Sequence, residues 1–383
     1  YDVPRAEPVE AIKADTDLEI SGDLNLNDSD ANLDISGHEF TVGGTISGDG
    51  SFTSDESTSL SLLNVGPAVQ LRFTAGSSVG TLEIGSADQG VASQVTLESN
   101  LRIAGELKNT PPLNEFIAAG ELELAGSYTG AGKLGGTENA TLLLSGDGAR
   151  LVLPMSGNGG FKQVQVSRTT GVTFSNNFRI TDELNSLAPV SLRDGILTLG
   201  SAGSAPGRLV LDPGTSLDLG NGGIRFEGSA DISIPAGSYL SGSDEAQIEF
   251  AGATANATLR FSPDSLKSRL RSIVLSKPNS EVTLGSPVSV IERVSVDGNS
   301  ATLHSNGFLS LASTASGSAN VEPLLNGASI TGSVRVERYI SGGPKDQFRG
   351  YRMLSSPVYD NTTDFPAEDR TTAFLQYIDD IYV

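Results

Sequence analysis

Short alternating triplets, in which one polar residue separates two apolar ones, recur along most of the chain with turn residues between them. Near the start the triplets step by 6, 9 and 7 residues, and later by 8, 7 and 8. Because successive side chains of a strand point to opposite faces, both apolar residues of a triplet lie on one face of a short β-strand. The triplets that show these steps are Leu18-Glu19-Ile20, Leu24-Asn25-Leu26, Leu33-Asp34-Ile35 and Phe40-Thr41-Val42, then Leu209-Val210-Leu211, Leu217-Asp218-Leu219, Ile224-Arg225-Phe226 and Ile232-Ser233-Ile234.

Strands of this length cannot bury an apolar face alone, but stacking similar units buries it. Three steps sum to about 22 residues, which suits one coil of a parallel β-helix with about three short strands per coil. We therefore expect an all-β fold, a single-stranded parallel β-helix (β-solenoid) of about 14 coils and about 65 Å in length. An antiparallel array of hairpins is the alternative, because Asn-Gly pairs at Asn221, Asn306 and Asn326 are typical of hairpin turns.

The triplets predict three regions along the chain. Residues 1–16 form an N-terminal lead-in or cap, residues 17–340 the parallel β-solenoid, and residues 341–383 a non-solenoid segment that begins a further module. Two stretches interrupt the solenoid pattern. Residues 110–116 contain two prolines and predict a loop, and residues 262–271 begin Ser-Pro and predict a short helix or turn.

The composition indicates a narrow, aliphatic core, and the net charge excludes some classes of binding partner. Aromatic residues make up only 6% of the chain and Trp is absent, so the core is expected to consist of aliphatic ladders. The net charge of -21 argues against binding to nucleic acid or to anionic lipid, since both require clustered Lys and Arg. With no Cys there is no disulfide, thiolate metal site or cysteine nucleophile.

One stretch near the start has the spacing of oxygen ligands in a calcium loop. Asp28, Asp30, Asn32 and Asp34 occupy alternate positions, and Glu39 follows them. However, Leu33 stands where a calcium loop requires Gly, and it also belongs to a strand triplet. A solvated solenoid corner is the competing interpretation, and no cofactor other than this candidate Ca²⁺ is expected. The Gly-Asp-Gly sequences at 48–50 and 146–148 are expected to be tight turns.

Catalytic motifs are not evident in the sequence. Parallel β-helices include polysaccharide lyases and glycosidases, which need carboxylates and basic residues clustered at one place on the shaft. The two histidines, His38 and His304, are far apart in sequence, and the acidic residues are spread along the chain. No Ser-His-Asp arrangement, phosphate loop or zinc spacing is present. The sequence therefore predicts no catalytic site.

Three segments resemble a known group of proteins: residues 301–311 (ATLHSNGFLSL), 330–340 (ITGSVRVERYI) and 349–358 (RGYRMLSSPV). They are similar to secreted, cell-surface β-solenoid repeat proteins of Bacteroidota. The resemblance implies an adhesin-like substrate of type IX secretion, and it brings no catalytic motif.

Together these observations predict a non-enzymatic, extracellular structural or adhesive module, a stalk or binding shaft of a larger bacterial cell-surface protein. A carbohydrate-active β-helix that binds or cleaves a polysaccharide is the first alternative, and a self-assembling filament or sheath subunit is the second. The expected partners are other domains of the same protein, glycans or neighbouring cell surfaces, and further copies of the chain through solenoid ends or faces. Membrane insertion is not expected.

Overall fold

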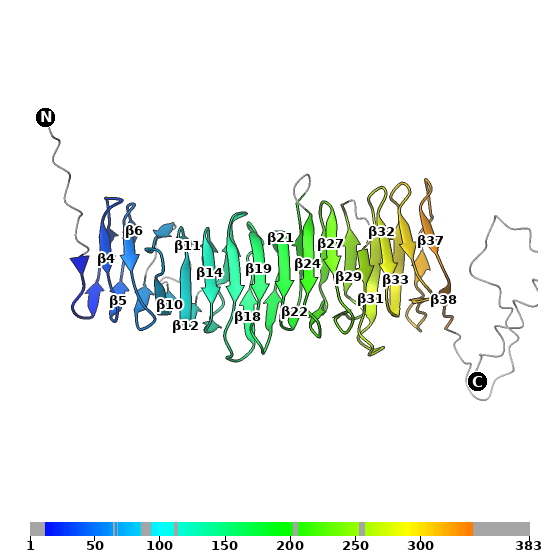
Figure 1. The fold of residues 1–383 in the computed structure, drawn as a ribbon, viewed down its shortest axis with the longest axis horizontal. Coiled ribbons are helices and arrows are strands. Elements are labelled where there is room, and N and C mark those ends of the chain that lie inside the picture. The colour runs from blue at the N-terminus through cyan, green and yellow to red at the C-terminus, as the bar shows by residue number, and fades with distance from the viewer. Residues whose placement is uncertain are drawn as a thin grey trace, which may run out of the picture.

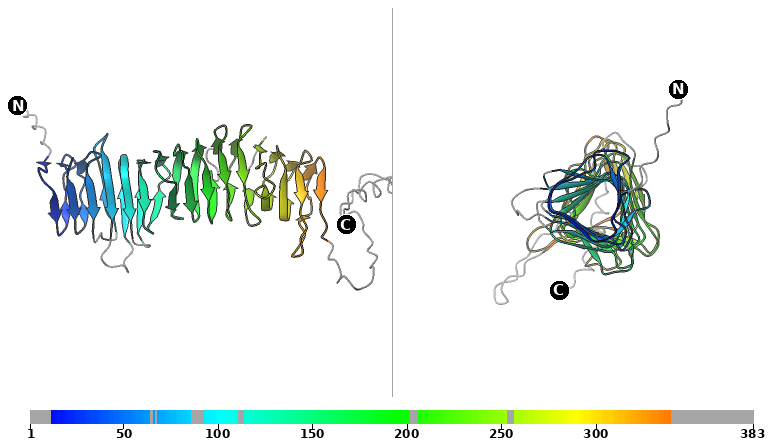
Figure 2. Two further views of the ribbon diagram at one scale, coloured as in Figure 1. Left: turned by 90° about the horizontal axis from the view of Figure 1, so that it is seen from below. Right: turned by 90° about the vertical axis from the view of Figure 1, so that its left-hand side faces the viewer.

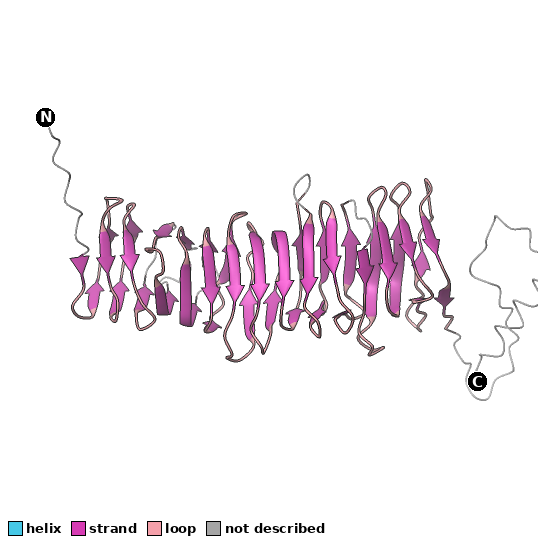
Figure 3. Ribbon diagram, viewed as in Figure 1, coloured by secondary structure: helices cyan, strands magenta, loops and turns pink. Residues whose placement is uncertain are grey.

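The computed structural model describes residues 12–339 except 64–65, 67, 86–92, 111–113, 202–205 and 253–256. The described chain is an elongated β-solenoid of about 14 turns (Figure 1), which confirms the predicted fold. Strands are present from one end to the other, and the described residues contain no helix, so none that could span a membrane (Figure 3). The predicted module at residues 341–383 lies outside the described residues.

The strands stack on three faces that surround one core, as the view along the axis shows (Figure 2). The chain visits the first face, then the second, then the third in each turn. The first face consists of β1 (Ile12–Lys13), β4 (Asn32–Asp34), β7 (Ser51–Thr53), the beginnings of β10 (Ser78–Ile84) and β12 (Leu101–Asn109), β14 (Glu121–Leu124), β17 (Thr141–Leu144), the ends of β19 (Phe161–Val166) and β21 (Phe178–Ser186), β24 (Gly207–Leu211), β27 (Ala230–Ser233), β30 (Ala257–Leu259), β32 (Glu281–Leu284), β34 (Thr302–His304) and β37 (Ser329–Thr331).

The second and third faces are built in the same way. The second face consists of β2 (Leu18–Ile20), β5 (Glu39–Val42), β8 (Ser59–Leu62), the ends of β10 and β12, β15 (Ser127–Thr129), β18 (Leu151–Pro154), β20 (Val172–Ser175), β22 (Val190–Leu192), β25 (Ser216–Asp218), β28 (Tyr239–Ser241), the beginnings of β31 (Arg269–Leu275) and β33 (Val288–Val296), β35 (Leu309–Leu311) and β38 (Val334–Val336). The third consists of β3 (Leu24–Asn25), β6 (Ile46–Ser47), β9 (Val69–Leu71), β11 (Gln94–Leu97), β13 (Glu115–Ala118), β16 (Lys133–Gly136), the beginnings of β19 and β21, β23 (Ile196–Leu199), β26 (Gly223–Phe226), β29 (Gln247–Phe250), the ends of β31 and β33, and β36 (Asn320–Val321).

The pairings between these described strands are parallel, and a single antiparallel bridge joins Ser313 and Ser318. The alternative of an antiparallel hairpin array is therefore wrong. Partners in register lie from 18 residues apart, at Val172 and Val190, to 27 apart, at Val190 and Leu217. The coil length thus varies around the predicted repeat, because the corner loops differ in length while the inward strand residues stay stacked.

Alternate residues of each strand point inward and stack on equivalent residues of the next coil. Along the first face, Leu122, Leu142, Val164, Leu184 and Leu209 form one such ladder, and each side chain is at most 1% exposed. A fully buried aliphatic side chain contributes about 1.5–3 kcal/mol relative to an exposed one. Repetition of this burial in every coil stabilises strands that are individually too short to persist.

Two expectations differ in detail from the structure. The triplet pattern also occurs at 288–290 and 294–296 and predicts two separate strands there, but these residues are the two arms of β33, which bends at a corner. At 262–271, where the sequence predicts a short helix or turn, the structure has a turn in which Asp264 accepts backbone hydrogen bonds, and β31 begins at Arg269. Ile12 and Lys13 already pair in parallel with β4, inside the segment assigned to the lead-in. The predicted loop at 110–116 overlaps undescribed residues, and β13 begins at Glu115.

Candidate functional site

Three side chains of the calcium candidate, those of Asp28, Asn32 and Asp34, make separate hydrogen bonds within turns and between strands. A carboxylate oxygen of Asp28 accepts the backbone N–H of Asp30 at 3.0 Å. Asn32 donates to the Thr53 hydroxyl at 2.9 Å, and Asp34 accepts the N–H of Ser36 at 3.0 Å. Hydrogen bonds from Ser36 lower the pKa of Asp34.

Glu39 lies beyond a corner, on β5 of the second face, whereas Asn32 and Asp34 lie on β4 of the first face. Nowhere in the described part of the chain do three or more His, Cys, Asp or Glu side chains gather as metal ligands. The structure therefore does not assemble Asp28, Asp30, Asn32, Asp34 and Glu39 into one coordination sphere.

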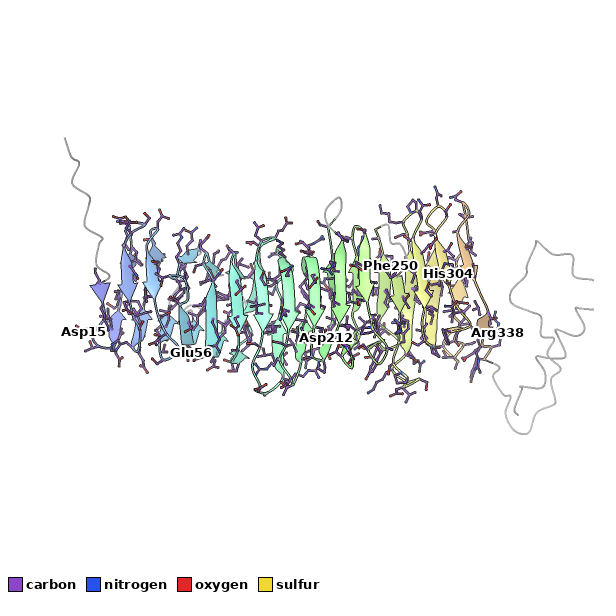
Figure 4. All side chains as sticks on the ribbon, in the orientation of Figure 1. Asp15, Glu56, Asp212, Phe250, His304 and Arg338 are labelled. Atoms are coloured by element: carbon purple, nitrogen blue, oxygen red, sulfur yellow. The ribbon has the colours of Figure 1, made fainter. Side chains whose placement is uncertain are left out.

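The remaining sequence candidates are also separate. Gly48 and Gly146 have φ of +96° and +83°, so both Gly-Asp-Gly sequences are turns, as predicted. The His38 ring nitrogen lies 3.7 Å from Asp17 near the N-terminal end. His304 lies toward the C-terminal end, where its ring is 2.8 Å from the Thr331 hydroxyl (Figure 4). The structure does not bring the two histidines together.

Many basic side chains on the outer faces are paired with acids of other coils. Arg208, for example, contacts Glu183 of the preceding coil and Asp231 of the following one. Exposed pairs of this kind contribute about 0–1 kcal/mol each to the free energy of unfolding, so they are a minor part of the stability of the fold. Other Arg and Lys ion pairs between coils in the described part of the chain are Arg72 with Asp49, Arg102 with Glu56 and Glu123, Lys108 with Glu83, Arg179 with Glu227, Arg225 with Glu249, Arg269 with Asp244, Arg271 with Glu292 and Arg293 with Glu322.

Arg168 differs from these exposed cations because it is only 2% exposed. It follows β19 at a corner and extends beneath the corner loops of the two preceding coils. Its Nε donates to the carbonyl of Ala149 at 2.8 Å, and its Nη1 is within 2.9–3.1 Å of the carbonyls of Ala125, Gly126 and Ser145. These bonds join three successive coils. Burial lowers the pKa of the Arg168 guanidinium, and the charge of Asp147 opposes that effect.

A surface pocket of about 350 Å³ lies over Arg168, between the corner loops that follow β14 and β17. Its wall is mostly apolar and includes Tyr128, Leu151 and Val152 together with Gly148, Arg150 and Arg168. The Tyr128 hydroxyl donates to the carbonyl of Gly132, and burial raises the pKa of this hydroxyl. Arg150 is held at the rim by a bond of 2.5 Å to the Ser191 hydroxyl.

Sequence reasoning did not identify Arg168 or this pocket. The only local signal is an Arg in a turn, Ser167-Arg168-Thr169-Thr170-Gly171, and such residues are ordinarily solvated. Arg168 is buried because the side chain reaches carbonyls that lie 19 to 43 residues earlier in the chain. That arrangement depends on the stacking of coils and not on neighbouring residues.

No family model, curated protein or solved structure matched this chain in the three comparisons with known proteins.

Proposed function

We propose that this chain is a non-enzymatic extracellular module, a rigid structural or adhesive shaft of a larger bacterial cell-surface protein. The observation that supports it best is the unbroken apolar core, which continues on three faces through about 14 turns. A solenoid with one continuous apolar core holds its two ends at a fixed separation, which is what a spacer requires.

The distribution of charge supports the same proposal. Many basic residues are paired between coils along the shaft, and the excess acid keeps the surface solvated. Within the described residues, acids and histidines do not form a group of three or more that could hold a metal ion.

Spin-label distances test whether the shaft is rigid. The chain has no Cys, so Glu19→Cys and Arg335→Cys place two unique labels on the second face, on β2 and β38. With about 4.8 Å per step, double electron–electron resonance should give a narrow distribution near 65 Å. The control pair, Glu19→Cys with Thr173→Cys on β20, should give about half that distance. Broad distributions, or distances that do not scale with coil number, would contradict a rigid shaft.

A polysaccharide-degradation screen tests the non-enzymatic part of the proposal, and a glycan array run beside it tests adhesion. We expect no release of reducing ends from any polysaccharide. Release that persists in repurified protein would overturn the proposal in favour of a carbohydrate-active β-helix.

Self-assembly is a second candidate, and the two ends of the shaft support it. Ile12 is 72% exposed and Leu18 41% exposed at one end, and Leu325 and Tyr339 are 58% and 53% exposed toward the other. Among the described residues, the terminal strands β1 and β38 have a partner strand on one side only, and an open strand edge can pair with another chain. Light scattering over a wide concentration range separates the two proposals, because only a filament subunit should form fibres that Leu18→Lys suppresses.

A further inference from the structure

We propose that the pocket over Arg168 binds the carboxylate of a small organic acid, about the size of one sugar acid, with Arg168 Nη2 as the charged donor. This inference rests on the geometry of the pocket and is independent of the shaft function proposed above.

The guanidinium of Arg168 has an unused donor. Nε and Nη1 are bonded to carbonyls, whereas Nη2 has no hydrogen-bond partner in the described structure. Although Nη2 has no partner, it is not fully buried and keeps some solvent-accessible surface. Among the described residues no carboxylate lies within 4.0 Å of this guanidinium. Burying a cation without an anionic partner costs free energy, and binding of an anion to that cation offsets part of this cost.

Gly148 gives access to that donor. A Cβ atom at position 148 would lie 2.3 Å from Arg168 Nη2, closer than any real contact. Both residues line the pocket, so the missing side chain of Gly148 leaves Nη2 open to it. Asp147, beside Gly148, is 3.3 Å from the Thr169 hydroxyl and does not occupy this position.

Charge favours a carboxylate over phosphate or sulfate, because a doubly charged anion is repelled more strongly by the net charge of -21 and by Asp147 beside the pocket. Because Nε and Nη1 are already used, Arg168 offers only the Nη2 nitrogen to any anion. Charge-assisted bonds from a single nitrogen to one carboxylate oxygen are short and strong. Arg150 at the rim is the second cation within the pocket lining, and it adds positive charge beside the ligand.

The shape of the pocket favours an acid with an organic body over a bare ion. Its volume of about 350 Å³ is within the range of small-molecule sites and far exceeds that of one water. The mostly apolar wall would contact a ring or a short carbon chain. Long-range repulsion from the net charge of -21 opposes any anion, so we expect millimolar affinity that depends on these short-range contacts.

Ligand-observed NMR titration with sodium glucuronate tests the inference, with glucose and sodium sulfate as the comparison ligands. Glucose keeps the ring without the carboxylate, and sulfate is an anion without an organic body. We expect saturable binding of glucuronate at millimolar concentration and binding at least tenfold weaker for the other two. Absence of saturable glucuronate binding, or equal binding of glucose or sulfate, would overturn the inference.

Two matched variants locate the site. Gly148→Ala should weaken glucuronate binding at least tenfold, because a methyl group 2.3 Å from Nη2 displaces the guanidinium or the loop and closes the approach to this donor. The control Gly157→Ala adds the same methyl group, where the nearest atom would be 3.8 Å away, and should bind as the wild type does. Thermal melting confirms that both variants are folded. Unchanged binding in Gly148→Ala, or equal loss in Gly157→Ala, would contradict the assignment.

Discussion

At the scale of single residues, polar side chains at the corners stabilise turns through hydrogen bonds. Asp55 is the clearest case, because one of its carboxylate oxygens accepts bonds from the Ser57 hydroxyl and from the N–H groups of Ser57 and Gly37. The bond from the Ser57 hydroxyl is the largest cause of the lowered pKa of Asp55. The corner therefore depends on the ionised carboxylate.

Asp55→Asn should consequently remove a pH-dependent part of the stability. A pKa lowered on folding gives stability that is complete above the unfolded value, about 4 for Asp, and is lost as pH falls through the lower folded value. We expect the variant to melt below the wild type at pH 7, with the difference shrinking below about pH 4. Melting curves from pH 2 to pH 8 measure this. A difference that is constant with pH would contradict the role of ionisation.

Inward positions of the ladders should not tolerate charge. Leu217 on β25 is 0% exposed and pairs with Val190 and Leu240 of the adjacent coils. Leu217→Asp buries an unpaired carboxylate and should cost about 4 kcal/mol or more. Chemical denaturation measures the loss. Ser216→Asp, at the neighbouring outward position, should change stability by about 0.5 kcal/mol or less.

At the scale of elements, glycines allow strands to bend around the same corner in successive coils. Gly80 and Gly105 lie within β10 and β12, and the register between these strands shifts just after Val79. A Cβ on Gly105 would lie 2.4 Å from the carbonyl oxygen of Gly80. The close approach of the two backbones thus requires a residue without a side chain.

Gly105→Ala should therefore separate the two coils at this corner. We expect a loss of about 1–3 kcal/mol, as for other overpacked sites, measured by chemical denaturation. Gly22→Ala is the matched control, because a Cβ there would have no atom within 4 Å. Equal effects of the two substitutions would show that backbone entropy, and not the close approach, is responsible.

At the scale of the whole molecule, stability should vary along the shaft. Interior coils have neighbours on both sides, whereas Leu18, Leu24 and Leu26 of the first coil are only partly buried or exposed. In a solenoid, each coil is stabilised mainly by its nearest neighbours, so the ends should open first.

Hydrogen exchange followed by mass spectrometry should show this gradient. Peptides from residues 12–35 should exchange faster than peptides from residues 120–200, because opening of an end coil breaks only one interface. Exchange that is uniform along the shaft would indicate a single cooperative unit and would contradict the expectation.

The sequence by itself determined the architecture, because its information is local and repeated. Leu217 and Leu219 alternate with Asp218, and such a pattern needs only neighbouring residues to specify which side of a strand is buried. The repeated triplet spacing then specifies stacking, since each short strand can bury its face only against its equivalent in the next coil.

Only the tertiary structure showed the backbone path at the corners and the residues that meet at the candidate site. Whether residues 288–296 form two strands or one bent strand depends on the path of the adjacent coils. Asp28 and Glu39 are near in sequence, yet the turn between β4 and β5 places Glu39 on another face. Arg168 meets the carbonyls of Ala125 and Ser145 because stacking brings coils within a side chain's reach. Such contacts depend on the length of every intervening loop, which local alternation of apolar and polar residues does not encode.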